Sequence, residues 1–258
     1  MLKKFKADLH IHSCLSPCSD WAMSPRKIIQ QSMEVGLNLI AICDDNSAEN
    51  AGAAMREGAR QGLTVLPGLE ICSREEVHIM ALFDGLDPAM EMQDYVYANL
   101  PGENKTKVFG FQVVANEKDE VIGENPRLLI GATRLGLHDI VDRTHMLDGI
   151  NISCHVDRPA YGIINQLGCI PDDLDLDGLE VSYHIQLATA AQTIPGIGNF
   201  SCVTASDAHY LNDIGKACTV FQMAEPTLAE IRLALAKKKR KKDTDLIAGI
   251  IAAHIGYC

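Results

Sequence analysis

The segment FKADLHIHSCLSPCSDWAMSPRKIIQQSMEVGLNLIAICDDN, residues 5–46, predicts a strand, a helix and a second strand in succession. Apolar and polar residues alternate in FKADLHI (5–11), which is typical of a strand. Ser24 followed by Pro25 predicts the start of a helix, and Gly36 predicts its end. NLIAIC (38–43) is a continuous apolar run, which predicts a buried strand. A helix that connects two buried strands predicts a parallel sheet.

The same alternation continues to residue 236. Further strands are expected at 63–71, 77–83, 149–154, 178–182, 200–206 and 218–223. Further helices are expected at 47–61, 88–100, 135–146, 160–167, 184–192 and 228–236. Because so many strand–helix units follow one another, the pattern favours a closed α/β barrel over an open sheet.

The segment 103–134 interrupts this rhythm. Its sequence VFGFQVVANEKDEVIGEN, residues 108–125, indicates two short strands around an Asn/Lys/Asp turn. We therefore expect a β-hairpin insertion beside the barrel. The barrel domain is expected to span residues 1–236, with the insertion at 103–134.

Residues 237–258 form a segment of different composition. KKKRKK (237–242) is a basic run, and a solvated helix end is favoured over a nucleic-acid contact. DLIAGIIAAHIGYC (245–258) is apolar but too short to span a bilayer. A docking helix, a partner contact and a disordered end all remain open for this tail, and no segment predicts an oligomeric state.

Composition limits the classes of partner. The 258 residues are 47% hydrophobic and carry a net charge of −11. An acidic surface repels phosphate backbones, so duplex nucleic acid is not expected as a partner. A small phosphorylated substrate is compatible with this charge, because bound divalent cations reverse the local field.

The sequence also bears on location. The absence of a long apolar run argues against a membrane span. Nine cysteines without a Cys-x-x-Cys pair indicate free thiols in the cytoplasm.

Histidines and acids recur where predicted strands meet loops. His10 and His12 lie two apart on a strand, so they face the same side with Cα atoms about 7 Å apart. Other residues of this kind follow or begin later strands: Asp44, Asp45, Glu70, His78, His155, Asp207 and His209. In a β/α barrel these strand ends form one crater. Several acids in one crater repel one another unless metal ions neutralise them, so the pattern predicts a metal cluster.

The motifs resemble a known family. DLHIHSCLSPCSD, AICDDN, GLE, EVHIMALF, HVDR and SDAHY look like the successive motifs of the PHP (polymerase and histidinol phosphatase) family, from about residue 6 to 236. The resemblance implies a distorted seven-stranded β/α barrel of the TIM-like kind. It also implies two or three divalent metals and hydrolysis of phosphate esters. It assigns the ligands as His10, His12, Glu70 and Asp207 for one metal, Glu70, His78 and His155 for a second, and Asp20, Asp45 and His209 for a third.

One position departs from the family pattern. Asp45 stands where the family usually has a histidine, and the insertion SCLSPC lengthens the loop before Asp20. Two carboxylates and one imidazole suit Mn²⁺, Fe²⁺ or Mg²⁺ better than Zn²⁺. The alternative is a third site that is weak or empty. Cys14 and Cys18 flank the first motif and could contact a metal, although packing is the commoner role of such thiols.

The resemblance implies an activity with alternatives. Metals in such a site activate water, neutralise phosphate and stabilise the leaving alkoxide. His155 or His209 could protonate the leaving group where it is free of metal. Arg158 could hold the phosphate, or it could instead pair with Asp157 or another acid.

We expect a metal-dependent hydrolase of small phosphorylated metabolites or nucleotides, similar to nucleoside 3′,5′-bisphosphate phosphatases, with zinc, manganese or iron. The alternatives are a histidinol-phosphatase-like enzyme and a non-catalytic metal- or ligand-binding PHP domain, the second because of Asp45. An exonuclease role, known for PHP domains of polymerases, is less favoured, because the chain is acidic and has no polymerase portion.

Overall fold

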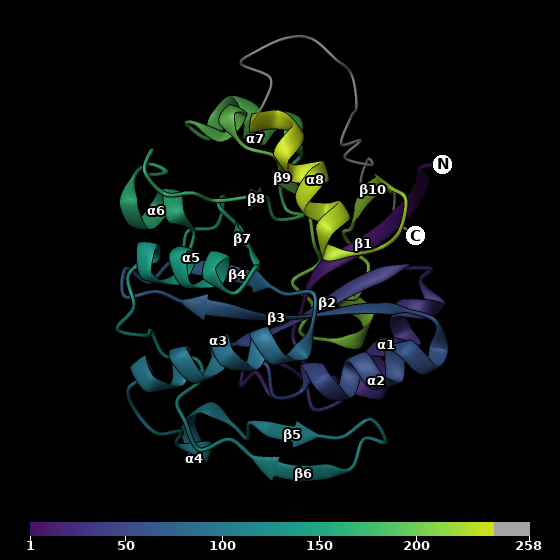
Figure 1. The fold of residues 1–258 in the computed structure, drawn as a ribbon. Coiled ribbons are helices and arrows are strands. Elements are labelled where there is room, and N and C mark those ends of the chain that lie inside the picture. Colours follow the sequence, from purple (N-terminus) through teal and green to yellow (C-terminus); the bar gives the residue numbers. More distant parts are fainter. Residues whose placement is uncertain (240–258) are drawn as a thin grey trace.

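The computed structural model describes residues 1–239, and these form a barrel-like sheet surrounded by helices (Figure 1). Its strands are β1 (Lys3–Ile11), β2 (Leu39–Asp45), β3 (Thr64–Cys72), β4 (His78–Leu82), β7 (Ile150–Ser153), β8 (Gly178–Glu180), β9 (Cys202–Val203) and β10 (Thr219–Met223). They pair in the order β10-β1-β2-β3-β4-β7-β8-β9. Each strand lies within or overlaps a segment expected from the sequence, although β9 is much shorter than expected.

Within residues 1–239 the sheet has eight strands, one more than the seven that the family resemblance implies. β10 lies at one edge of the order and pairs antiparallel with β1 from Lys3↔Met223 to Ala7↔Thr219. A hydrogen bond to a side chain links the end of β9 to β10: the Thr204 backbone N–H donates to Thr219 Oγ1 at 2.9 Å. The expected TIM-like α/β barrel is therefore confirmed, with a nearly closed sheet and a corrected strand count.

The helices are α1 (Pro25–Glu34), α2 (Ala51–Gln61), α3 (Leu86–Asn99), α4 (Thr106–Phe109), α5 (Leu137–Met146), α6 (Ile163–Leu167), α7 (Leu187–Thr193) and α8 (Leu228–Lys239). Pro25 occupies the first turn of α1, as expected, because its missing N–H has no partner to lose there. The Thr227 hydroxyl accepts the Glu230 N–H and so caps α8. None of the helices in the described part is long and apolar enough to cross a membrane.

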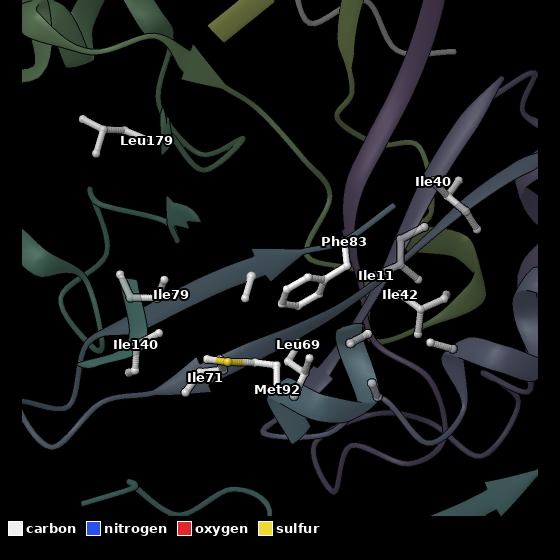
Figure 2. Packing of buried hydrophobic residues seen from close by; sticks show 14 of the residues in the cluster. Ile11, Ile40, Ile42, Leu69, Ile71, Ile79, Phe83, Met92, Ile140 and Leu179 are labelled. Carbon is white, nitrogen blue, oxygen red and sulfur yellow. The ribbon is translucent and has the colours of Figure 1, made fainter. Parts of the chain in front are cut away.

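Two apolar layers hold the barrel together. Alternate strand residues point outward against the helices, where Ile42, Leu69, Ile79 and Met92 pack in one buried cluster (Figure 2). The intervening residues point inward with residues of α8 and form a second buried cluster. Because alternation divides each strand between the two layers, a polar residue on the inward side reaches the barrel mouth only at a strand end.

The insertion forms its own small sheet. β5 (Val113–Ala115) and β6 (Val121–Glu124) pair antiparallel and lie outside the barrel sheet, beside α2 and α3 (Figure 1). Asn50 fixes the hairpin, because its Nδ2 donates to the Val113 carbonyl and its Oδ1 accepts the Ala115 N–H. The expected hairpin insertion is thus confirmed. The domain limits at residues 103, 134 and 236 stay predictions, and the expected tail lies outside the described residues from 240 onward.

Candidate metal centre

The polar side chains of the barrel mouth come from the ends of neighbouring strands. Asp45 and Glu70 are direct partners in the parallel pairing of β2 and β3, so they point to the same side. His78 begins β4 and lies opposite Cys72, the last residue of β3, because β4 runs antiparallel to it. A residue at the start of β4 therefore joins residues at the ends of other strands.

A bulge in β1 turns both histidines of the first motif inward. The register of β1 against β2 shifts between Asp8 and Ile11, and Ile11 points to the outer layer. His10 and His12 flank Ile11 on the opposite side, and their Nε2 atoms lie 3.2 Å apart. Bulges commonly re-aim side chains at functional sites. Alternation therefore puts the two imidazoles on one side of β1, and the break in the strand turns that side toward the barrel interior.

The side chains of four residues surround one point at the centre. His12 Nε2 lies 3.4 Å from Glu70 Oε2 and 3.2 Å from Asp207 Oδ1. His10 Nε2 lies 3.3 Å from Glu70 Oε1 and 3.6 Å from Asp207 Oδ1. A tetrahedral metal with bonds of about 2.1 Å separates its ligand atoms by about 3.4 Å. The buried Asp207 Oδ1 also has no hydrogen-bond partner among the described residues, so this donor set fits a divalent metal.

Glu70 extends the centre to a second group. Its Oε1 atom lies 2.8 Å from His78 Nδ1 and 3.1 Å from His155 Nε2. One buried carboxylate therefore faces four imidazoles, as expected for a bridging ligand. Three protein ligands in the second group leave a coordination position for water, which is typical of catalytic metal sites.

Hydrogen bonds behind the imidazoles orient them. His10 Nδ1 lies 2.7 Å from Glu180 Oε2, and His12 Nδ1 lies 3.0 Å from Ser16 Oγ. His209 Nδ1 donates to the Asp207 carbonyl at 2.7 Å. Each bond places the ring proton on Nδ1 and leaves the Nε2 lone pair free to bind a metal.

The pKa values of the site residues show that imidazoles and carboxylates stabilise each other's charged forms. Burial lowers the pKa of His12, but Asp207 and Glu70 outweigh it and raise the pKa to about 10. Burial raises the pKa of Glu70, but His78 and His10 outweigh it and hold the pKa well below its usual range. Protons on imidazole thus neutralise the carboxylates where metal ions would do so. Two site residues, His155 and Asp207, also have a positive φ, a strained conformation that often occurs at functional sites.

The structure brings together most, though not all, of the expected ligands. The residues that gather are His10, His12, Asp45, Glu70, His78, His155, Asp207 and His209. Asp20 does not contribute its carboxylate: its backbone lies beside His209, but its side chain is exposed and its Oδ1 accepts the Ala22 N–H at 2.7 Å. Cys18 lies nearer, with Sγ 3.2 Å from Asp45 Oδ2. The lengthened loop explains the exchange, because extra chain before Asp20 alters which side chain faces the crater.

The contacts resolve the pairing of Arg158 that the sequence left open. Arg158 Nη1 lies 2.5 Å from Asp207 Oδ2, so it pairs with a site carboxylate and not with Asp157. Asp157 instead accepts hydrogen bonds from the N–H and the hydroxyl of Ser182. Arg158 is thereby held at the edge of the centre, where further guanidinium N–H groups can meet an anion.

Glu180 is the residue that sequence reasoning missed. It is fully buried at the end of β8 and contacts His10, while its Oε1 has no hydrogen-bond partner in the described part of the chain. Its signal was present in GLEVS, where Leu179 and Val181 occupy one side of the strand and Glu180 the other. A charged residue on the inward side at a strand end indicates the crater.

Comparison with known proteins agrees with this geometry. Residues 198–239 match the family model described as PHP-associated. A 5′-3′ exoribonuclease of Haemophilus influenzae is 32% identical over 94 residues, which are 35% of this chain and 32% of that protein. A 3′,5′-nucleoside bisphosphate phosphatase of Chromobacterium violaceum is 34% identical over 85 residues, which are 32% of this chain and 28% of that protein. The matches thus span about a third of the length of these curated relatives.

Solved structures share the fold over most of the chain. The lesion-specific endonuclease EndoQ of Pyrococcus furiosus superimposes with a TM-score of 0.69 at 19% identity, covering 91% of this chain and 56% of that protein. Together with the family model and the relatives, it confirms the resemblance to the PHP family. An Endonuclease Q structure with a TM-score of 0.65 contains a 27-mer duplex. The expectation that duplex nucleic acid is no partner is therefore unsupported, because that protein, which shares this fold over 56% of its length, is in complex with a duplex.

Proposed function

From this PHP-type barrel and the centre at its mouth, we propose that the protein is a metal-dependent phosphoesterase that removes phosphate from nucleotides. The observation that carries the proposal is the position of Glu70, which lies within 3.4 Å of nitrogen atoms of four histidines. A single carboxylate so placed is suited to bridge two divalent cations. Phosphoester hydrolysis is the chemistry that such paired sites commonly support.

Different residues of the centre would bind metal, bind phosphate and donate a proton. His10, His12, Glu70 and Asp207 would hold one metal, and Glu70, His78 and His155 a second. When bound, the metals would supply a water of lowered pKa and neutralise phosphate oxygens. Arg158 binds the phosphate through the guanidinium N–H groups that Asp207 does not engage. His155 and His209 can donate a proton to the leaving oxygen only where the Nε2 atom is free of metal.

Exposed aromatic rings beside the centre support a nucleotide substrate. Trp21 is 63% exposed and lies edge-on to Phe111, with ring centroids 5.3 Å apart. The neighbouring Asp20 N–H donates to the His209 carbonyl at 2.9 Å, so the Trp21 loop adjoins a site residue. Nucleobases stack on such rings, whereas a small sugar phosphate has no surface to place there. Both curated relatives also act, by their names, on nucleotides or RNA.

A nuclease acting on the end of a nucleic acid is the second candidate. The aromatic pair Trp21 and Phe111 and the name of the exoribonuclease favour it. The name of EndoQ, a lesion-specific endonuclease, favours nuclease activity only in general. The net charge of −11 opposes extended contact with a phosphate backbone, so recognition of one terminal nucleotide is the form that fits.

The test is a substrate panel with the purified protein. Metal-stripped protein receives Mn²⁺, Zn²⁺ or Fe²⁺ and is offered adenosine 3′,5′-bisphosphate, a 5′-phosphorylated RNA oligonucleotide, an abasic-site duplex and histidinol phosphate. We expect phosphate release from the bisphosphate, abolished in Glu70→Gln. Cleavage of the RNA or of the duplex would favour the nuclease, and exclusive turnover of histidinol phosphate would favour that phosphatase. A metal-loaded protein inert toward all four would identify a binding domain.

A further inference from the structure

The loop between β1 and α1 brings a thiol to the place where the motif predicted a carboxylate. Cys18 Sγ lies 3.2 Å from Asp45 Oδ2, and it falls within 4.8 Å of ligand atoms of His12 and His209. Asp20 makes no such approach, since its carboxylate accepts a backbone N–H of its own loop. The third group of the centre therefore contains sulfur as well as oxygen and nitrogen.

We propose that Cys18, Asp45 and His209 hold a divalent metal of the zinc or ferrous type, as a site distinct from the two that share Glu70. The proposal rests on the metal centre of the proposed function and names the chemistry of its third site. Asp45 is buried, and His209 is oriented by its Nδ1–H donation to the Asp207 carbonyl, which leaves Nε2 as the ligand atom. His12 lies beside this group with its ring stacked on His209 at 4.3 Å.

The spacing of the thiol and carboxylate fits a shared metal. Zinc binds sulfur at about 2.3 Å and oxygen at about 2.1 Å, so a tetrahedral ion separates these two atoms by about 3.6 Å. In the structure the Cys18 S–H group donates a hydrogen bond to Asp45 Oδ2 across 3.2 Å. On binding, the S–H bond breaks, a sulfur–metal bond forms and the proton passes to solvent. Cys18 is exposed, so the ion can enter from the crater mouth and retain a bound water.

The thiolate changes which metal this chain selects. A site of two carboxylates and one imidazole favours hard ions, whereas thiolate favours zinc and iron over magnesium. Cys18 thereby replaces the oxygen ligand expected from Asp20 and offsets the loss of the imidazole at position 45. The rival view is that Cys18 only donates a hydrogen bond to Asp45 and binds no metal.

Cobalt substitution separates the two views without measuring activity. Full-length protein is stripped, loaded stepwise with Co²⁺, and followed through the near-ultraviolet charge-transfer band that a cobalt–thiolate bond produces. We expect the wild type to show the band. The Cys18→Ser variant should lose the band and bind one Co²⁺ equivalent fewer, whereas the control Asp20→Asn should keep the band. Absence of the band from a wild type that binds three equivalents would overturn the proposal. So would a Cys18→Ser variant that keeps the band, or one that keeps all three equivalents.

Alkylation gives a second readout that needs no variant. Zinc at about ten times its Kd should slow iodoacetamide labelling of Cys18 about tenfold, because only the free site reacts. Cys169 is also exposed, makes no contact with the centre and should label at the same rate with or without zinc. Equal labelling of Cys18 in both conditions would overturn the proposal. A protein that passes both tests but releases no phosphate would retain this site and lose only the proposed function.

Discussion

Replacement of Glu180 by glutamine tests how the centre is held in position. Glu180 is fully buried, and its Oε2 lies 2.7 Å from His10 Nδ1, on the side of the ring away from the metal ligands. The carboxylate fixes the Nδ1–H tautomer of His10 and increases the basicity of its Nε2 atom. Glutamine keeps the size and one acceptor oxygen but removes the negative charge.

The expected magnitude follows from this contact. Loss of a carboxylate behind a ligating histidine weakens metal binding about 10- to 100-fold, which corresponds to about 1.4–2.7 kcal/mol. Glu180→Ala should cost more, because it leaves the buried Nδ1–H without a partner, a penalty of about 1–3 kcal/mol. Neither variant removes a ligand, so the number of metals bound at saturation should not change.

The assay is a competition titration of stripped protein with Mn²⁺ against a chromogenic chelator, with thermal unfolding to confirm the fold. Glu57→Gln is the matched control, since Glu57 is also a buried glutamate, pairs with Arg60 at 2.6 Å on α2, and contacts no ligand. We expect Mn²⁺ affinity to fall in Glu180→Gln and to stay unchanged in Glu57→Gln. Equal affinity in all three proteins would refute the positioning role of Glu180.

Three further predictions concern the exposed Trp21 ring beside the centre, the third metal site and the pH dependence of stability. Trp21→Ala should raise KM for adenosine 3′,5′-bisphosphate about 5- to 160-fold, since base stacking contributes about 1–3 kcal/mol, while p-nitrophenyl phosphate turnover stays constant; an equal loss on both substrates would contradict stacking. Asp45→His should shift the metal preference further toward Zn²⁺ and Asp45→Ala should lower third-site occupancy, measured as metal content; unchanged content in both variants would show that Asp45 is no ligand. In metal-free protein burial lowers the pKa of His12, but Asp207 and Glu70 raise it from 6.5 to about 10. This stabilisation is present below pH 6.5 and is lost as pH rises through 10, so Tm should fall over that interval without metal and not with it; parallel Tm curves would argue against metals replacing these protons.

Much of the barrel could be predicted from local sequence, because alternation and apolar runs identify strands wherever both faces are buried. The direction of β4 could not be predicted, since a strand buried on both faces has the same continuous apolar pattern whichever way it runs. His78 nevertheless could be selected from its place at a strand end. The pairing of β10 with β1 joins residues more than two hundred positions apart, and no local pattern encodes it.

The candidate ligands on strands were predictable, whereas those on loops were not. Glu70 follows from strand alternation, which fixes the side of the sheet that it faces. The conformation of SCLSPCSD depends instead on bonds to distant residues, including Ser13 and Ser16 to Asp44. Those bonds determine that Cys18 and not Asp20 faces the centre, and only the folded chain places their partners together.

Phosphate release after controlled metal return tests the central claim most directly. Stripped wild-type protein and stripped Glu70→Gln are mixed with adenosine 3′,5′-bisphosphate, and inorganic phosphate is measured as Mn²⁺ is added. We predict no release before addition, a rise to saturation with at least two equivalents in the wild type, and a rate lower by more than about a hundredfold in Glu70→Gln. Release that is independent of metal, or equal in the two proteins, would contradict a metal-dependent phosphoesterase built around Glu70.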